Sequence, residues 1–359
     1  MRYAIILTFF ICTTLRFQLN AQTSNDTIHF EGENHFKNIR QLTFGGDNAE
    51  AYFSFDDRYI IYQRTDLKAG IPCDQIWMGK IPEHEQDPFV PKLVSTGTGR
   101  TTCAFFYPDN QHIVYGSTHL GGQDCPPVPD RKKYGNKYIW PIYESFDIFL
   151  ADTTGKVIKR LTKTKGYDAE ATISPRGDMM VFTSMRNGDL DLYTMDLNGK
   201  HIKQITRQLG YDGGAWFSPD GGKIIWRASR PQTEQEIAEY KSLLAENLVA
   251  PTHMEVWMAN VDGTDAHQVT QLSQANWAPN FTADGKQIIF CSNHEYKRGF
   301  PFNMYLVNPD GSQLQKISRD KGFDAFPMFS HDGKKIIFCS NRNNGGTRDT
   351  NIFIADWVE

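Results

Sequence analysis

The fold is decided by the stretch Phe217-Ser218-Pro219-Asp220-Gly221, which leads into Ile224-Ile225-Trp226. Proline fixes φ at the first corner of a turn, aspartate hydrogen-bonds its own backbone, and glycine accepts the positive φ at which strands reverse. The apolar run after the turn is typical of a strand that is buried on both faces. The stretch therefore predicts two antiparallel strands joined by a tight turn.

This unit recurs six times along the chain of 359 residues. The other clear copies are Phe281–Phe290 and Phe329–Phe338. The looser copies are Ile173–Gly177, Phe106–Asn110 and Phe53–Asp57. A second turn, such as Asp196–Gly199, follows a further strand, so each unit holds four strands. Four-stranded sheets that pack on one another in succession are propeller blades. We predict an all-β, six-bladed β-propeller with four antiparallel strands per blade.

The spacing of the turns indicates two insertions. Intervals of 44, 64 and 48 residues separate the turn glycines Gly177, Gly221, Gly285 and Gly333. A four-stranded blade takes roughly 40–50 residues, so the longest interval contains an insertion, residues 231–252. It begins with a capping box at Thr233–Glu236, which predicts a short helix. Its apolar face is formed by Ile237, Tyr240, Leu244 and Leu248. A second insertion, residues 119–144, is rich in Gly, Pro, Lys and Tyr and predicts an ordered loop.

The two ends of the repeat region complement each other. The last strand, Asn351–Ala355, leaves the final blade one strand short. Near the start, His35–Leu42 matches the outer strand of a blade, as at Val157–Leu161. We expect this N-terminal strand to complete the last blade and close the ring, because an incomplete blade would expose an unpaired strand edge. The propeller is then expected to span residues 35–359.

The N-terminus has the pattern of a cleaved leader. Arg2 precedes an apolar stretch, Ala4–Leu15, and a small residue, Ala21, stands at the expected cut point. This pattern predicts a signal peptide over residues 1–21, followed by a flexible segment over residues 22–34. The apolar stretch is shorter than the ~20 residues that a membrane-spanning helix needs. We expect a periplasmic or secreted protein without a membrane span.

The repeat at Phe217–Trp226 and its five relatives resemble the TolB-like or PD40 (WD40-like) β-propeller repeat. The resemblance extends from about Ile39 to Trp357. TolB proteins are periplasmic, carry an α/β domain before the propeller and bind partners over the mouth of the central channel. The segment between Ala21 and the first repeat is too short for that domain. The resemblance therefore implies the fold, the compartment and a binding role without the α/β domain.

The net charge limits the classes of binding partner, and the cysteine content allows a disulfide bond. The formal net charge is −4, and loss of Arg2 and Arg16 with the leader makes it more negative. This acidity argues against nucleic acid or an anionic membrane as the main partner. Five cysteines remain after cleavage: Cys73, Cys103, Cys125, Cys291 and Cys339. Cys73 and Cys125 lie in loops on the same face of the first two blades, so a bridge between them is feasible but not required.

Carboxylates gather where the inner strands begin. The Gly-aromatic-Asp triplets end in Asp168, Asp212 and Asp324, and Glu50 and Glu170 stand two residues further along their strands. A ring of inward carboxylates at the channel mouth can hold a cation or a cationic side chain of a partner. The alternative, which we favour for the aspartates because their triplet repeats, is that they cap turns.

A second repeated position follows each second strand. It is occupied by Asp66, His119, Arg186, Arg230, His294 and Arg342. His119 and His294 can bind a metal or transfer protons. Structural ion pairs, such as Arg186 with Asp191, are the favoured interpretation of the arginines. Without an HxH or HExxH spacing, neither a metal nor another cofactor is expected.

Three functions fit this sequence. The favoured one is a monomeric binding module that contacts an envelope protein, a peptide or a glycan at the channel mouth and the insertion-bearing face. The alternative is a carbohydrate-active propeller enzyme, a lyase or a hydrolase, that uses channel-mouth acids or histidines. The third is an architectural subunit of an envelope complex. The chain has no Gly-x-Ser-x-Gly elbow and no phosphate-binding loop motif, so we expect no catalysis.

Overall fold

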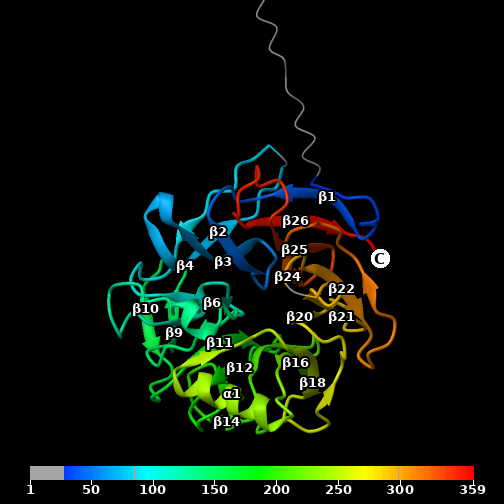
Figure 1. Ribbon diagram of the computed structural model, residues 1–359. Helices are drawn as coiled ribbons and strands as arrows, with labels where there is room; N and C mark the ends of the chain where they lie inside the picture. The colour runs from blue at the N-terminus through cyan, green and yellow to red at the C-terminus, as the bar shows by residue number, and fades with distance from the viewer. Residues whose placement is uncertain (1–27, 85, 298) are drawn as a thin grey trace, which may run out of the picture.

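The computed structural model describes residues 28–84, 86–297 and 299–359. The expected signal peptide, residues 1–21, and residues 22–27 lie outside the described part of the chain. Six four-stranded antiparallel sheets surround a central axis (Figure 1). The prediction of a six-bladed β-propeller is confirmed.

The blades follow the chain order, with the innermost strand first. Blade 1 contains β2 (Asp47–Phe53), β3 (Tyr59–Asp66), β4 (Ile71–Lys80) and β5 (Lys92–Leu93). Blade 2 contains β6 (Thr101–Phe106), β7 (His112–Ser117), β9 (Asp147–Asp152) and β10 (Val157–Arg160). Blade 3 contains β11 (Asp168–Ile173), β12 (Met179–Ser184), β13 (Asp191–Asp196) and β14 (Lys203–Gln204).

The remaining blades repeat this arrangement. Blade 4 contains β15 (Asp212–Phe217), β16 (Lys223–Ala228), β18 (Glu255–Asn260) and β19 (His267–Gln268). Blade 5 contains β20 (Asn276–Phe281), β21 (Ile288–Ser292), β22 (Asn303–Val307) and β23 (Gln315–Lys316). Blade 6 contains β24 (Asp324–Phe329), β25 (Lys335–Ser340), β26 (Asn351–Trp357) and, as its outer strand, β1 (Phe36–Gln41).

The Ser-Pro-Asp-Gly turn works through its serine and aspartate side chains. Ser218 Oγ donates to Asp220 Oδ1 (2.5 Å) and accepts from the backbone amide of Lys223 (2.9 Å). Gly221 adopts the left-handed φ of 66° that the turn requires. The same serine- or threonine-to-aspartate bond joins Ser54 to Asp56, Thr282 to Asp284 and Ser330 to Asp332. The motif thus sets the register of the first two strands.

A second serine or threonine anchors the third strand of every blade. In blade 3 the hydroxyl of Thr206 accepts a hydrogen bond from the Leu192 amide (2.8 Å). Each of the other blades repeats this bond, with acceptors Thr43, Ser95, Thr162, Thr270 and Ser318. These residues follow the outer strand, so the hydroxyl ties the outer strand to the third strand. This contact explains the leucine or isoleucine followed by threonine or serine in the repeat.

The N-terminal strand closes the ring as predicted. β1 pairs antiparallel with β26, and the Phe36 ring stacks on Phe338 of β25 (centroids 5.5 Å apart). The segment before it was expected to be flexible, but residues 28–34 are anchored to blade 6. Glu33 is 1% exposed and forms an ion pair with Arg342 (3.0 Å). Arg342 also donates to the Ile28 carbonyl oxygen (2.8 Å). A buried charge pair therefore holds this segment in place.

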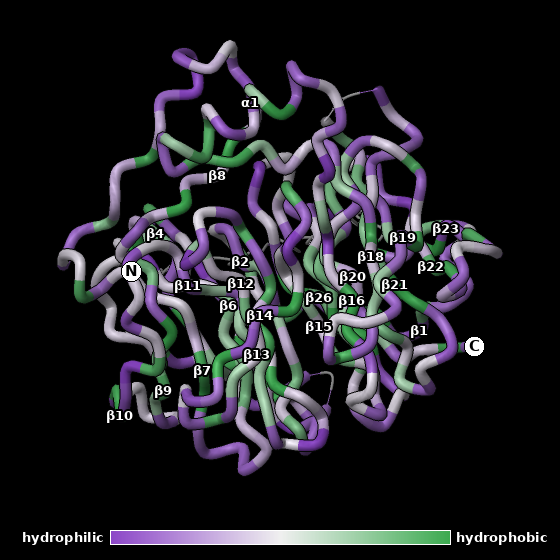
Figure 2. Tube along the Cα trace, turned by 90° about the horizontal axis from the view of Figure 1, so that it is seen from below, coloured by the Kyte–Doolittle hydropathy of each residue, from purple (hydrophilic) through white to green (hydrophobic). Residues whose placement is uncertain are grey.

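The two insertions join each other on one face of the disc. β8 (Trp140–Pro141) of insertion 1, residues 119–144, pairs with β17 (Leu248–Val249) of insertion 2, residues 231–252. Figure 2 shows β8 and α1 standing together on this face, which we call the insertion face. The expected helix forms as α1 (Glu234–Ala245) with its capping box, but it ends before Leu248, which lies in β17. None of the described helices is long and apolar enough to cross a membrane.

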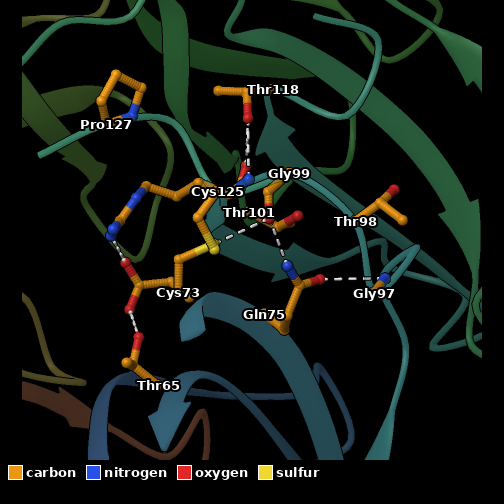
Figure 3. The surroundings of a disulfide bond; sticks show 12 residues. Thr65, Cys73, Gln75, Gly97, Thr98, Gly99, Thr101, Thr118, Cys125 and Pro127 are labelled. Carbon is orange, nitrogen blue, oxygen red and sulfur yellow. Dashed lines mark hydrogen bonds and ion pairs between the residues drawn. A yellow bond between two sulfur atoms is a disulfide. The ribbon is translucent and has the colours of Figure 1, made fainter. Parts of the chain in front are cut away.

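A disulfide bond fixes the start of insertion 1. Cys73 of β4 is bonded to Cys125, with Cα atoms 5.9 Å apart. Figure 3 shows the bond beside Gln75, whose side-chain amide donates to the Gly99 carbonyl oxygen (2.7 Å). The bond that the sequence left open is thus present, and it ties insertion 1 to the neighbouring blade.

Candidate functional site

Each inner strand contains one β-bulge at the same place. The bulged residue has a left-handed φ between 49° and 60° in all six strands. A bulge re-aims a side chain out of the alternating pattern of a strand, and here it directs the residue to the propeller axis. We call these residues the bulge ring: Glu50, Cys103, Glu170, Gly214, Ala278 and Phe326.

The bulge ring surrounds a small cavity on the propeller axis, the channel cavity. Its free space is ≈ 30 Å³ for the centres of water-sized molecules, enough for one or two waters. Beyond the bulge ring, Tyr52 of blade 1 packs on Trp216 of blade 4 across the axis (centroids 4.7 Å apart). Phe105 of blade 2 packs on the same tryptophan (5.4 Å). These aromatic rings narrow the channel toward the face opposite the insertions.

Glu170 is fully partnered inside the cavity. It forms an ion pair with Arg227 of β16, accepts hydrogen bonds from Thr183 Oγ1 (2.7 Å) and Tyr211 OH (2.9 Å), and accepts one from the Gly214 amide (3.0 Å). A Cβ at Gly214 would lie 1.9 Å from a guanidinium nitrogen of Arg227, so a larger residue there would displace the guanidinium from this network. This network neutralises one carboxylate of the bulge ring.

Insertion 1 covers the same network from outside. The Arg227 guanidinium lies over the Trp140 ring of β8 (5.3 Å to the centroid) and over the Tyr211 ring (5.4 Å). Trp140 packs in turn on Trp277 of blade 5 (5.4 Å). Insertion 1 thus reaches across the channel mouth and contacts the far side of the ring.

Glu50 is the second carboxylate of the cavity, and its surroundings differ. It accepts hydrogen bonds from Tyr52 OH (3.3 Å) and from the Cys103 thiol, and no cation lies within ion-pair distance among the described residues. Burial raises the pKa of Glu50, and the nearby Glu170 carboxylate adds to the rise, while Arg227 opposes it. The half-buried Cys103 thiol lies beside it. Of the two carboxylates in the channel cavity, Glu50 is therefore the one whose negative charge would have no directly paired cation.

The three repeated aspartates do not line the channel cavity. Each is buried and forms an ion pair with the arginine that follows the second strand of the same blade: Asp168 with Arg186 (3.0 Å), Asp212 with Arg230 (2.5 Å) and Asp324 with Arg342 (3.0 Å). The expected ion pairs of the arginines are present, but the expected partner of Arg186 was wrong. Asp191 instead accepts hydrogen bonds from Thr206 and Gln204. Neither turn capping nor an inward ring describes the aspartates.

The two histidines lie in blades 2 and 5 and are not brought together. His119 Nδ1 is hydrogen-bonded to Ser117 Oγ (2.9 Å), and His294 Nδ1 to Ser292 Oγ (3.0 Å). Each packs on an aromatic ring of the third strand, and burial lowers the pKa of both. In the part of the chain that the structure describes, no group of three or more His, Cys, Asp or Glu is arranged to hold a metal ion.

Sequence reasoning missed Arg227 and Trp140. Arg227 carried a signal, since it is a charge at the end of the buried run Ile224–Trp226, where the equivalent residues of blades 5 and 6 are Cys291 and Cys339. Such a residue needs a buried partner. Trp140 lies in a loop whose path depends on insertion 2, so no local pattern could place it.

The repeat, the bulge ring and the ring closure can now be compared with known proteins. Residues 142–248 match the family model of the TolB beta propeller domain, PD40. This part of the six-bladed propeller is thus similar to the TolB propeller domain. No curated protein sequence matches it.

Solved structures show the same fold. The six-bladed propeller is similar to a TolB-like protein from Agrobacterium tumefaciens, with a TM-score of 0.58 and 16% identity over 89% of this chain and 97% of that chain. For TolB from Acinetobacter baumannii the TM-score is 0.50 and the sequence identity is 18%. The match covers 87% of this chain and 63% of the Acinetobacter protein. For an oligogalacturonate lyase from Vibrio parahaemolyticus the TM-score is 0.50 and the sequence identity is 14%. The match covers 88% of this chain and 79% of the lyase. At such identities the likeness concerns the fold alone.

Proposed function

We propose that this TolB-type propeller is a monomeric, exported binding module of the cell envelope that contacts a protein, a peptide or a glycan without catalysing a reaction. The observation that carries the proposal is the pairing of β8 with β17, which joins two insertions from different blades into one ordered layer at the channel mouth. Loops that a rigid scaffold positions in this way commonly carry binding functions.

The charged groups of the channel support binding over catalysis. Glu170 and Arg227 neutralise each other, and the cavity of ≈ 30 Å³ is too small for a sugar ring. His119 and His294, the two histidines of the repeated position, lie in different blades and are each hydrogen-bonded to a serine. Contact with a ligand therefore belongs to the surface around the mouth.

That surface presents aromatic side chains. Tyr138 packs on Trp140 (centroids 6.1 Å apart), and on the other side of Trp277 the stack continues through Phe302 to Phe300. The two ends of this aromatic row are open to solvent: Tyr138 is 38% and Phe300 is 64% exposed. Aromatic residues of this kind are enriched at protein interfaces.

Export is supported by the leader-like N-terminus and by the Cys73–Cys125 disulfide bond, because such bonds persist in oxidising compartments. N-terminal sequencing of the protein from producing cells is expected to begin at Gln22. A chain recovered with Met1 intact, or with both cysteines reduced, would contradict export.

The binding surface can be tested by photo-crosslinking in producing cells. A photoreactive residue is placed at Tyr138 or Phe300 and, as matched controls, at the exposed Val90 or Leu314, which lie in loops of the opposite face. We expect defined adducts from the first pair and none from the second. Equal adducts at all four positions, or none at Tyr138 and Phe300, would refute the insertion face as the binding surface.

A further inference from the structure

Glu50 is the carboxylate of the channel cavity that has no cation within ion-pair distance in the described part of the chain. Arg227 compensates Glu170, which also accepts three further hydrogen bonds. Glu50 accepts a long hydrogen bond from Tyr52 and one from the Cys103 thiol, both of which are neutral groups. A carboxylate in such surroundings gains most from a cation that enters the cavity.

We propose that the channel cavity binds the ammonium group of a lysine side chain of a partner protein or peptide, with Glu50 as its counter-ion. The inference rests on the proposed binding function and specifies the chemistry of the partner at the channel mouth. It concerns Glu50 alone, since the three repeated aspartates are paired with arginines within their blades.

The size of the cavity selects the cation. Space for one or two waters accommodates an ammonium group, which is about as large as a water molecule. A hexose ring is too large for this space, and the ammonium group is more compact than the planar guanidinium of arginine. The unbranched carbon chain of lysine is also slender enough to follow the ammonium group past the bulge ring.

The walls of the cavity suit such a side chain. Tyr52, Trp216 and Phe326 line it, and aromatic rings attract cations while packing against methylene groups. Phe326 and Ala278 are half-buried, so part of the bulge ring is accessible to solvent. On the other side, the contact between Tyr52 and Trp216 blocks the axis. A partner side chain therefore enters from the insertion face.

Cys103 provides a direct reporter, because it belongs to the bulge ring and is half-buried. The other described cysteines are buried thiols or disulfide-bonded. In the full chain, the Cys103 thiolate attacks the sulfur of a methanethiosulfonate, which forms a mixed disulfide and expels methanesulfinate. Rates are measured with the cationic 2-aminoethyl reagent and the anionic 2-sulfonatoethyl reagent. Their ratio cancels the ionisation of the thiol, which burial disfavours.

We expect the cationic reagent to be preferred by about tenfold or more relative to a small free thiol. Glu50→Gln should abolish the preference, whereas Glu83→Gln, in a loop of the opposite face, should preserve it; Cys103→Ser defines the background.

In a second arm, n-butylammonium should slow the reaction of the neutral methyl reagent in the unaltered protein, and potassium chloride at the same concentration should not. An unaltered ratio in Glu50→Gln, or equal slowing by potassium, would overturn the lysine site.

This test is separable from that of the binding function. If crosslinks at Tyr138 and Phe300 form and persist unchanged in Glu50→Gln while the Cys103 rates show no charge preference, the lysine site is wrong and the binding surface stands. If the Cys103 rates behave as expected and no crosslink forms, the cavity stands and the proposed binding surface is wrong.

Discussion

Blades 3, 4 and 6 differ from blades 2 and 5 in one pair of positions. Where the inner strand begins with aspartate, the residue after the second strand is arginine, and the two form a buried ion pair. Where the inner strand begins with Thr101 or Asn276, the residue after the second strand is His119 or His294. Each histidine is hydrogen-bonded to the serine two residues before it. The two positions therefore act as a unit, because the charge of one residue determines which partner can be buried beside it.

Blade 6 is the extreme case of the charged type. Arg342 faces two carboxylates, Asp324 of its own blade and Glu33 of the N-terminal segment, and all three side chains are fully buried. Its ion-pair contacts thus connect the first described residues to the last blade. In blade 5 the neutral type also reaches the neighbouring blade, because Asn276 donates to the Met254 carbonyl oxygen (2.8 Å) and to Glu255 Oε2 (3.1 Å) of blade 4.

Removal of Arg342 is expected to have the largest effect. Arg342→Met leaves Glu33 and Asp324 buried without a cation, and loss of one partner of a buried pair costs about 3–5 kcal/mol. The free energy of unfolding, measured by urea titration, should fall by that amount. The matched control is Arg58→Ala, at an exposed pair with Asp56, where the change should stay below about 1 kcal/mol. Similar losses in both variants would mean that the buried pair is not special.

Conversion of blade 2 to the charged type should have an intermediate effect. Thr101→Asp alone places a carboxylate at a fully buried position and is expected to cost about 1–3 kcal/mol in unfolding free energy at pH 8. Adding His119→Arg should restore at least half of the loss, because Ser117 can accept from the new guanidinium as Ser184 does from Arg186. A double variant no more stable than Thr101→Asp would show that the blade, and not the residue pair, decides the type.

Acidification should produce the smallest effect. The folded-state pKa of His119 and His294 is lowered below 6.5 by burial, so the folded protein binds protons less readily than the unfolded chain. Their contribution to stability is present above pH 6.5 and is lost as the pH falls. Asp212, whose pKa burial raises to about 6, acts oppositely, since its contribution is lost as the pH rises from about 4 to 6.

The measurement is urea unfolding at pH 7, 6 and 5. A His119→Gln/His294→Gln variant should lose less stability between pH 7 and pH 5 than the unaltered protein. If the free energy of unfolding changed with pH by the same amount in both proteins, the two histidines would not contribute stability above pH 6.5 as stated.

Much of the scaffold could be predicted from the sequence because its signals are local. The Ser-Pro-Asp-Gly turn and the capping box at Thr233–Glu236 each depend on neighbours in the chain. The strand at residues 36–41 was recognisable because it repeats the pattern of an outer strand, as at Val157–Leu161. The aspartate–arginine pairs could also have been predicted, since aligning the repeats shows that Asp168 is equivalent to Thr101 and Arg186 to His119. They were missed because the partner was sought in the next strand.

The channel was less predictable because its contacts join different blades. The bulge that turns Glu170 to the axis produces no motif, and Arg227 reaches it from blade 4. Tyr52 and Trp216 meet across the axis only because six blades close at this diameter. Such contacts depend on the summed geometry of the ring and not on any one repeat.

The pairing of β1 with β26 also has a consequence for the order of folding. Residues such as Asn38 and Asp356, 318 positions apart in sequence, meet in one sheet. During synthesis, residues 36–41 remain an unsatisfied strand edge until residues 351–357 have emerged. Blade 6 is thus the blade that cannot be completed early, and the interval before it closes is when a growing chain is most exposed to mispairing with another copy.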